Sequence, residues 1–164
     1  MNIEQLFKTQ ENVDNEIAKN MPAEWEGFGD YRSLMHRKFA FRVEVMELAN
    51  EIGFFKDWKH SHTIDKGAAL EELADCMAFL LSIGNTQGYN KMLKAIETFD
   101  AEEYAFGDLF DMLTDMHLSN IGKYTMAFGL ILGIGLKLGA IEEEIVEAYN
   151  RKAAKNITRQ AEGY

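Results

Sequence analysis

Residues 68–83 read AALEELADCMAFLLSI, and this stretch decides the fold. After Asp75 it contains almost no polar residue. A helix that is apolar on every side has to be surrounded by other elements of the protein. We therefore expect residues 68–83 to form a central helix whose second half is buried, with its acidic residues near one end.

Helical spacing of apolar residues continues along most of the chain. A period close to 3.6 residues predicts further helices over residues 3–18, 31–55, 91–98, 100–117, 121–138 and 140–160. Asp100 is a plausible N-cap for one of them. Proline occurs once, at Pro22, in a polar connection over residues 22–30, and no alternating strand pattern competes. The prediction is one all-α domain over residues 1–164, a helical bundle of six to seven helices with a four-helix core.

Charge and composition exclude several classes of partner. The net charge is −10 and no lysine or arginine cluster is present, so a nucleic-acid partner is not expected. A phosphorylated ligand would need metal cations between itself and such a protein. The longest apolar stretch, residues 126–136, is shorter than the ~20 residues that cross a bilayer, and the first residues lack a signal-peptide pattern. With Cys76 as the single cysteine, we expect a cytoplasmic protein without a membrane partner.

Two pairs of acidic residues have the same helical spacing. Glu44 and Glu47 are followed, after 24 intervening residues, by Glu72 and Asp75. Residues three apart on an α-helix are stacked neighbours, and Glu51 continues the line of the first pair. Two facing helices could bring the four carboxylates together, where they would repel each other unless cations neutralised them. Oxygen ligands without His or Cys favour Mg²⁺, with Mn²⁺ as the alternative.

A solvated acidic face is the simpler interpretation of either pair taken alone. The second pair argues against it, because Glu72 and Asp75 open a strongly apolar helix, where an unpaired charge is costly. A ferritin-like di-iron bundle would need Glu-x-x-His pairs, and no histidine follows these acids at that spacing.

Two segments near the acids carry groups that suit a nucleotide. Phe55, Lys56, Trp58 and Lys59 follow the first pair by one to two helical turns. Lysines can bind phosphate and a tryptophan face can pack on a base or sugar. Taken alone, however, the segment favours a loop whose tryptophan caps the bundle, flanked by solvated lysines. The ending KNITRQAEGY, residues 155–164, concentrates charge and amide groups on a tail that should fray unless something holds it.

The segment GLILGIGLKLG, residues 129–139, contains four glycines. Their spacing matches neither the dinucleotide-binding fingerprint nor the P-loop. We interpret Gly129, Gly133, Gly135 and Gly139 as small residues that permit close packing, within a subunit or between subunits.

Together these segments resemble a known family. E-x-x-E followed by E-x-x-D on helices resembles the all-α nucleoside triphosphate pyrophosphatase superfamily, which includes MazG-like enzymes. The blocks ELANE with FFKDWK, LEELADCMAFLLSIGN and KNITRQAEGY, with TQENVD near the start, are similar to the dimeric dUTPases of phages, some bacteria and trypanosomatids. The resemblance covers most of the chain, whereas residues 101–129 match no motif of the family.

The resemblance implies Mg²⁺-dependent hydrolysis of dUTP to dUMP and pyrophosphate by a homodimer. It implies that Glu44, Glu47, Glu72 and Asp75 bind metal and that Glu47, or its neighbour Glu44, orients the attacking water. The phosphate-binding residues would be Lys56, Lys59, Lys155 and Arg159. The residues near the nucleoside would be Gln10, Trp58, Asn85 and Asn156, of which Asn156 could instead reach the phosphates.

Two alternative functions remain open. One is a related pyrophosphatase that acts on another or a damaged nucleotide. The other is a non-catalytic helical interaction module whose acidic residues lie on the surface.

Overall fold

A computed structural model describes residues 1–19, 30–61 and 63–162. Its helices are α1 (Glu4–Lys19), α2 (Asp30–Ile52), α3 (Lys66–Thr86), a 3₁₀ turn η2 (Tyr89–Lys91), α4 (Phe106–Thr114), α5 (Ile121–Lys137) and α6 (Glu142–Ala161). No strand forms in these ranges, so the all-α prediction is confirmed. Of the connection expected over residues 22–30, residues 22–29 lie outside the described residues, as do Gly163 and Tyr164, whereas Asp30 is already the first residue of α2.

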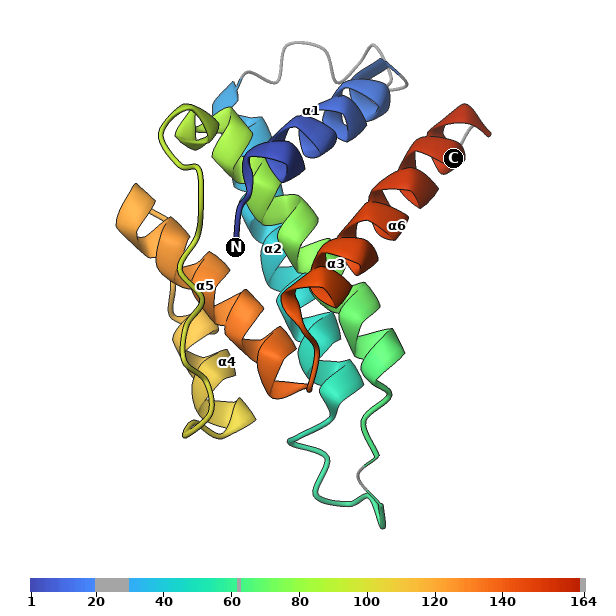
Figure 1. The fold of residues 1–164 in the computed structure, drawn as a ribbon, viewed down its shortest axis with the longest axis vertical. Coiled ribbons are helices and arrows are strands. Elements are labelled where there is room, and N and C mark those ends of the chain that lie inside the picture. The colour runs from blue at the N-terminus through green and yellow to red at the C-terminus, as the bar shows by residue number, and fades with distance from the viewer. Residues whose placement is uncertain (20–29, 62, 163–164) are drawn as a thin grey trace.

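Helix α3 lies at the centre of the bundle, as its sequence predicts. It contacts α1, α2, α5 and α6, and α2 runs along it for most of its length (Figure 1). The α3 side chains of Leu73, Met77 and Leu80 are completely buried. Asp65 caps its N-terminus by accepting a hydrogen bond from the Ala68 N–H at 3.0 Å. Because α3 is buried among four helices, the acids in its first half are held at the boundary between core and solvent.

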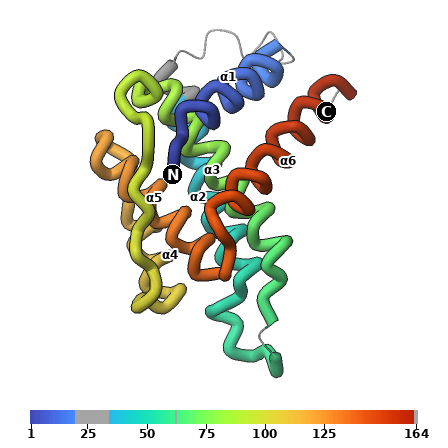
Figure 2. The backbone as a smooth tube through the Cα atoms, viewed as in Figure 1, coloured from blue at the N-terminus to red at the C-terminus, as the bar shows by residue number. Residues whose placement is uncertain are grey.

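Helix α2 ends three residues earlier than the spacing of its apolar residues suggests. Gly53 follows its last residue, Ile52, with a φ angle of 67°, in the left-handed region that favours glycine. The aromatic and lysine residues from Phe55 onward therefore belong to the loop between α2 and α3, at one end of the molecule (Figure 2).

The helix expected over residues 91–98 is wrong. Beyond η2 the chain is extended, and Ala95 pairs with Asn2 in an isolated antiparallel bridge. The Ile3 N–H donates to the Lys94 carbonyl at 3.0 Å and the Ile96 N–H to the Met1 carbonyl at 2.9 Å, while the Ile96 side chain enters the core. Tertiary contacts with the N-terminus thus override a local helical pattern.

The extended segment also explains two glycines of α5. A Cβ on Gly129 would lie 2.7 Å from the Glu97 carbonyl oxygen, and a Cβ on Gly133 would lie 2.5 Å from that of Phe99. The Phe99 N–H donates to the Gly129 carbonyl at 3.1 Å. These glycines let an extended chain lie directly on the helix, so the close packing they permit here is within one subunit.

Helix α4 begins later than predicted, and Asp100 is not its N-cap. The cap is Ala105, whose N–H donates to Asp108 Oδ2 at 3.2 Å, whereas Asp100 Oδ1 accepts from the Glu102 N–H at 3.2 Å within a turn. Within the described residues no single helix is long and apolar enough to cross a membrane. Only α5 and α6 taken together pass that test, and they are bent by 110°.

Candidate active site

Carboxylates from two helices meet where α2 packs against α3. Glu44 of α2 and Glu72 and Asp75 of α3 each place one carboxylate oxygen within 4.8 Å of the other two, and all three residues are half-buried. The three-residue spacing of Glu72 and Asp75 stacks their side chains on one face of α3. Three of the four residues expected to bind metal therefore lie together.

Glu47, the fourth expected ligand, lies at the edge of this group. Glu47 is exposed, and its negative charge helps to raise the pKa values of Glu44, Glu72 and Asp75. Glu51, which continues the same line on α2, acts in the same way on the pKa of Glu72. The acidic stretch of α2 thus faces the acids of α3 over about two helical turns.

The cluster is electrostatically unfavourable without a cation. Burial, followed by the charges of Asp75, Glu47 and Glu72, raises the pKa of Glu44 from 4.5 to about 7. Burial is also the main cause that raises the pKa values of Glu72 and Asp75. Closely spaced carboxylates of this kind gain when a divalent ion replaces their mutual repulsion by attraction.

A lysine that the sequence analysis did not single out supplies one positive charge to the cluster. Lys152 of α6 forms an ion pair with Asp75. Burial alone would lower the pKa of Lys152, but the hydrogen bond to Asp75 and the nearby carboxylates outweigh it and raise that pKa. Lys152, Asn156 and Arg159 have the i, i+4, i+7 spacing of one helix face, which was the signal available in the sequence.

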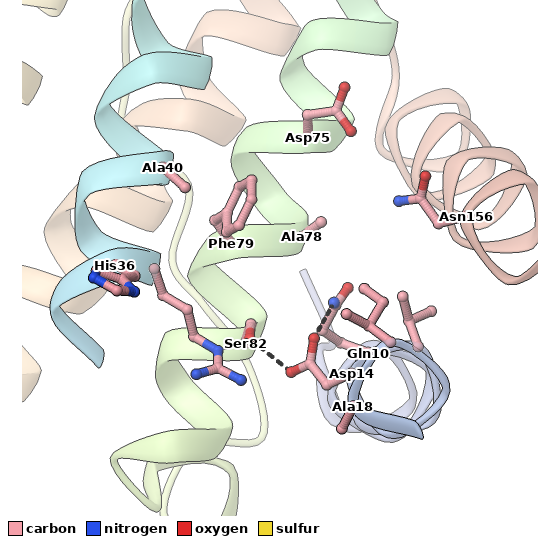
Figure 3. A pocket seen from close by; sticks show the side chains of 13 residues that line it. Gln10, Asp14, Ala18, His36, Ala40, Asp75, Ala78, Phe79, Ser82 and Asn156 are labelled. Carbon is pink, nitrogen blue, oxygen red and sulfur yellow. Dashed lines mark hydrogen bonds between the residues drawn. The ribbon is translucent and has the colours of Figure 1, made fainter. Parts of the chain in front are cut away.

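A pocket of about 370 Å³ adjoins the carboxylates. Helix α1 lines it with Gln10 and Asp14, α2 with Arg37, α3 with Asp75, Phe79 and Ser82, and α6 with Asn156 (Figure 3). Asp75 belongs to both the cluster and the pocket. A ligand in the pocket could therefore extend directly toward the carboxylate cluster.

Hydrogen bonds join the polar residues of the pocket wall. Gln10 Nε2 donates to Asp14 Oδ1 at 2.8 Å, and Ser82 Oγ donates to Asp14 Oδ2 at 2.6 Å (Figure 3). Arg37 Nε donates to Ser82 Oγ at 2.7 Å. The wall is thus a polar network fixed across three helices, and Phe79 adds an aromatic ring to the lining of the same pocket.

The four candidate phosphate-binding cations come from two different elements. Lys56 and Lys59 lie in the loop after α2, where Lys56 Nζ donates to the Asn50 carbonyl at 2.6 Å and Lys59 is exposed. Lys155 is exposed on α6, and the charge of Arg159 on the same helix lowers the pKa of Asp75. Arg159 therefore lies near enough to the cluster for its charge to act on one of the carboxylates.

The four candidate nucleoside-binding residues are also separated. Gln10 and Asn156 line the pocket. Trp58 is 71% exposed in the loop after α2, with its ring 6.3 Å from that of Phe55. Asn85 Nδ2 donates to the Phe7 carbonyl at 3.0 Å, which ties α3 to α1.

Several pocket residues had no individual role in the sequence analysis. Asp14 entered only as the end of the TQENVD motif, Phe79 and Ser82 entered only within the block LEELADCMAFLLSIGN, and Arg37 did not enter at all. Ser82 was detectable as the one polar side chain between Cys76 and Gly84. For Arg37 and Phe79 the sequence offers no comparable signal.

Fold and site together define an all-α protein with a carboxylate site suited to divalent cations, next to a pocket of nucleoside size. A family model described as dUTPase matches residues 2–164. The chain belongs to this family, the dimeric all-α dUTPases. No curated protein matches the chain in sequence. Family membership makes the protein an enzyme, a dUTP diphosphatase with a nucleotide substrate, and the family generally depends on divalent metal ions.

Proposed function

We propose that this enzyme hydrolyses dUTP to dUMP and pyrophosphate with Mg²⁺, for which Mn²⁺ is the alternative ion. One observation carries the proposal: three half-buried carboxylates within 4.8 Å of one another share Asp75 with a nucleoside-sized pocket. Hard carboxylate oxygens with raised pKa values fit such an ion.

In this proposal Glu44, Glu47, Glu72 and Asp75 hold the metal. The ion supplies Lewis acidity toward phosphoryl oxygens and lowers the pKa of bound water. Glu47, or alternatively Glu44, orients the attacking water and accepts its proton. The exposed position of Glu47 leaves room for a water molecule beside it, whereas Glu44 is half-buried within the cluster itself.

The rest of the nucleotide would be divided between the pocket and the surrounding cations. The base would stack on Phe79 and face Gln10, with Asn156 near the sugar or the phosphates. Arg159 and Lys155 on α6, and Lys56 and Lys59 from the loop after α2, would neutralise the triphosphate. The pocket is not lined by Lys56, Trp58, Lys59 or Asn85. A nucleotide-binding role for these residues requires that the loop approach the pocket or that the substrate extend out of it.

The direct test is pyrophosphate release from dUTP, dCTP and dTTP, each with and without Mg²⁺. We expect release from dUTP only with the ion, and much faster than from the other two. Similar rates on all three would favour a related pyrophosphatase acting on another or a damaged nucleotide. Glu47→Gln should weaken Mg²⁺ binding and reduce turnover by about 10² or more; a variant with unchanged turnover and affinity would contradict its assigned role.

We also propose that the active form is a homodimer. The outer face of α2 carries a stripe of exposed apolar residues, Met35, Phe39, Val43 and Met46. Their i, i+4, i+8, i+11 spacing forms one continuous line, and unpartnered apolar stripes of this kind mark interaction surfaces. A second copy of the chain could cover this stripe symmetrically, α2 against α2. We further propose that the protein is cytoplasmic, of phage or bacterial origin, and folded as one domain over residues 1–164.

A further inference from the structure

A buried tyrosine outside the pocket, Tyr149, forms a hydrogen bond with the pocket residue Gln10. Tyr149 of α6 is completely buried, and its hydroxyl donates to Gln10 Oε1 at 3.0 Å. The same hydroxyl lies 3.3 Å from the Leu6 carbonyl oxygen. Tyr149 does not line the pocket, and its hydrogen bond to Gln10 links it directly to a residue that does.

Gln10 is held with its amide in one orientation by partners at both ends. The amide oxygen receives the Tyr149 hydroxyl, and the amide nitrogen donates one hydrogen to Asp14 Oδ1. A flipped amide would place its oxygen against the Asp14 carboxylate, and neither atom can donate. Gln10 is only 4% exposed, so an unpaired amide atom at this position would be costly. The nitrogen keeps a second hydrogen, and Gln10 lines the pocket.

Asp14 next to it is held as an acceptor. Its Oδ1 receives the Gln10 amide and its Oδ2 receives the Ser82 hydroxyl. The Ser82 hydroxyl must donate to Asp14, because Arg37 Nε already donates to the Ser82 oxygen. Each carboxylate oxygen can still accept a further hydrogen bond.

The wall therefore presents a fixed pair of groups, an N–H donor and a carboxylate acceptor, on adjacent turns of α1. The imide edge of uracil offers the opposite pair, a carbonyl acceptor next to the N3–H donor. Cytosine offers an amino donor next to an unprotonated N3, so both contacts would be mismatched. A site that hydrogen-bonds a base edge rejects a mismatched base because buried polar groups are left unpaired.

We propose that Tyr149 is a positioning residue for base selection: it holds the Gln10 amide so that its N–H side, beside the Asp14 acceptor, reads the imide edge of uracil and rejects cytosine. This rests on the proposed function, in which the pocket receives the base. Burial, and next the charge of Asp14, raise the pKa of Tyr149, which keeps its hydroxyl a donor throughout the neutral range.

The test is Tyr149→Phe, with kcat/KM measured for dUTP, dCTP and dTTP. Without the hydroxyl, Gln10 Oε1 loses its donor and the amide is free to turn. We expect the dUTP to dCTP ratio of kcat/KM to fall by about tenfold, mainly through KM for dUTP. The dUTP to dTTP ratio should stay constant, because thymine carries the same imide edge. A general loosening of the pocket would change both ratios.

Tyr124→Phe is the matched control. Tyr124 is also completely buried, and its hydroxyl donates to the Leu80 carbonyl at 3.0 Å on another side of α3. This variant should leave both ratios at the wild-type values. An unchanged dUTP to dCTP ratio in Tyr149→Phe, or an equal fall in Tyr124→Phe, would overturn the inference.

Gln10→Glu tests the same idea if Tyr149→Phe does not fold. It keeps an acceptor for the Tyr149 hydroxyl but removes the N–H, so the dUTP to dCTP ratio should again fall; a retained ratio would overturn the inference. Failure of the proposed function has a different signature. In that case the wild-type enzyme itself would show no preference for dUTP over dCTP.

Discussion

Lys152 of α6 pairs with Asp75 of α3, and the two side chains are only 16% and 15% exposed. This lysine places a positive charge in direct contact with the carboxylate cluster. It also ties the C-terminal helix to the central one at the boundary between the cluster and the pocket. Lys152 thus offsets part of the negative charge of the cluster.

Lys152→Met should therefore destabilise the metal-free protein. Removing one partner of a largely buried pair leaves the other charge uncompensated, and we expect a loss of about 1–3 kcal/mol in the free energy of unfolding. Added Mg²⁺ should recover much of this loss, since the ion takes over the compensation of Asp75. Urea unfolding with and without Mg²⁺ measures both values.

Arg151→Met on the same helix is the control. Arg151 pairs with Glu147 at 3.0 Å, but the two side chains are 62% and 70% exposed. Its loss should cost no more than about 0.5 kcal/mol, with or without Mg²⁺. Equal effects of the two substitutions would show that the Lys152–Asp75 pair has no special role.

The raised pKa of Glu44 predicts that metal binding depends on pH. This pKa is about 7 in the folded protein and 4.5 in an unperturbed glutamate, so between these values the folded state holds a proton that the unfolded state releases. The stabilising contribution of this proton is complete below pH 4.5 and is lost as the pH rises through about 7. Mg²⁺ must displace the proton, so its affinity should rise up to neutral pH and then level off.

Calorimetric titration with Mg²⁺ in two buffers of different ionisation enthalpy measures the released protons. We expect release at about pH 6 and much less at about pH 8.5. Glu44→Gln should bind Mg²⁺ more weakly and release fewer protons at the lower pH. An Mg²⁺ affinity that does not change over this range would contradict the assignment of Glu44.

The sites of close packing on α5 make a separate prediction about stability. Gly133→Ala would place a Cβ 2.5 Å from the Phe99 carbonyl oxygen, which belongs to backbone and cannot move aside easily. We expect a loss of about 1–3 kcal/mol, because the extended segment has to shift away from α5. Gly122→Ala near the start of the same helix meets only Asn120 Oδ1, at 3.4 Å, and should be neutral or stabilising. Thermal unfolding of the two variants distinguishes steric conflict from helix propensity.

Features that depend on a single helix could be predicted from the sequence alone. The apolar second half of residues 68–83 predicted the central position of α3, and the three-residue spacing predicted which carboxylates would stack. Features that depend on contacts between distant segments were not accessible. Residues 91–98 have helical spacing. In the structure they are extended, because their backbone hydrogen-bonds to residues 1–3 and the following residues pack on the glycines of α5. Lys152 lies in a helix with many charges. Its spacing places it on one face with Asn156 and Arg159, but only the packing of α6 on α3 shows that this face meets the carboxylates.

The apolar stripe on α2 predicts the effect of a single substitution on assembly. Phe39 lies in the middle of the stripe and is 66% exposed in one chain. In a symmetric dimer through α2, Phe39→Glu would bury two like charges near the axis, so the dissociation constant should rise by at least ~30-fold, the equivalent of ~2 kcal/mol. Light scattering coupled to size-exclusion chromatography over a range of concentrations measures the shift from dimer to monomer. Met92→Glu, at a residue that is 69% exposed but outside the stripe, should leave the oligomeric state unchanged. A wild-type monomer, or a Phe39→Glu variant that remains as dimeric as the wild type, would exclude this face as the interface.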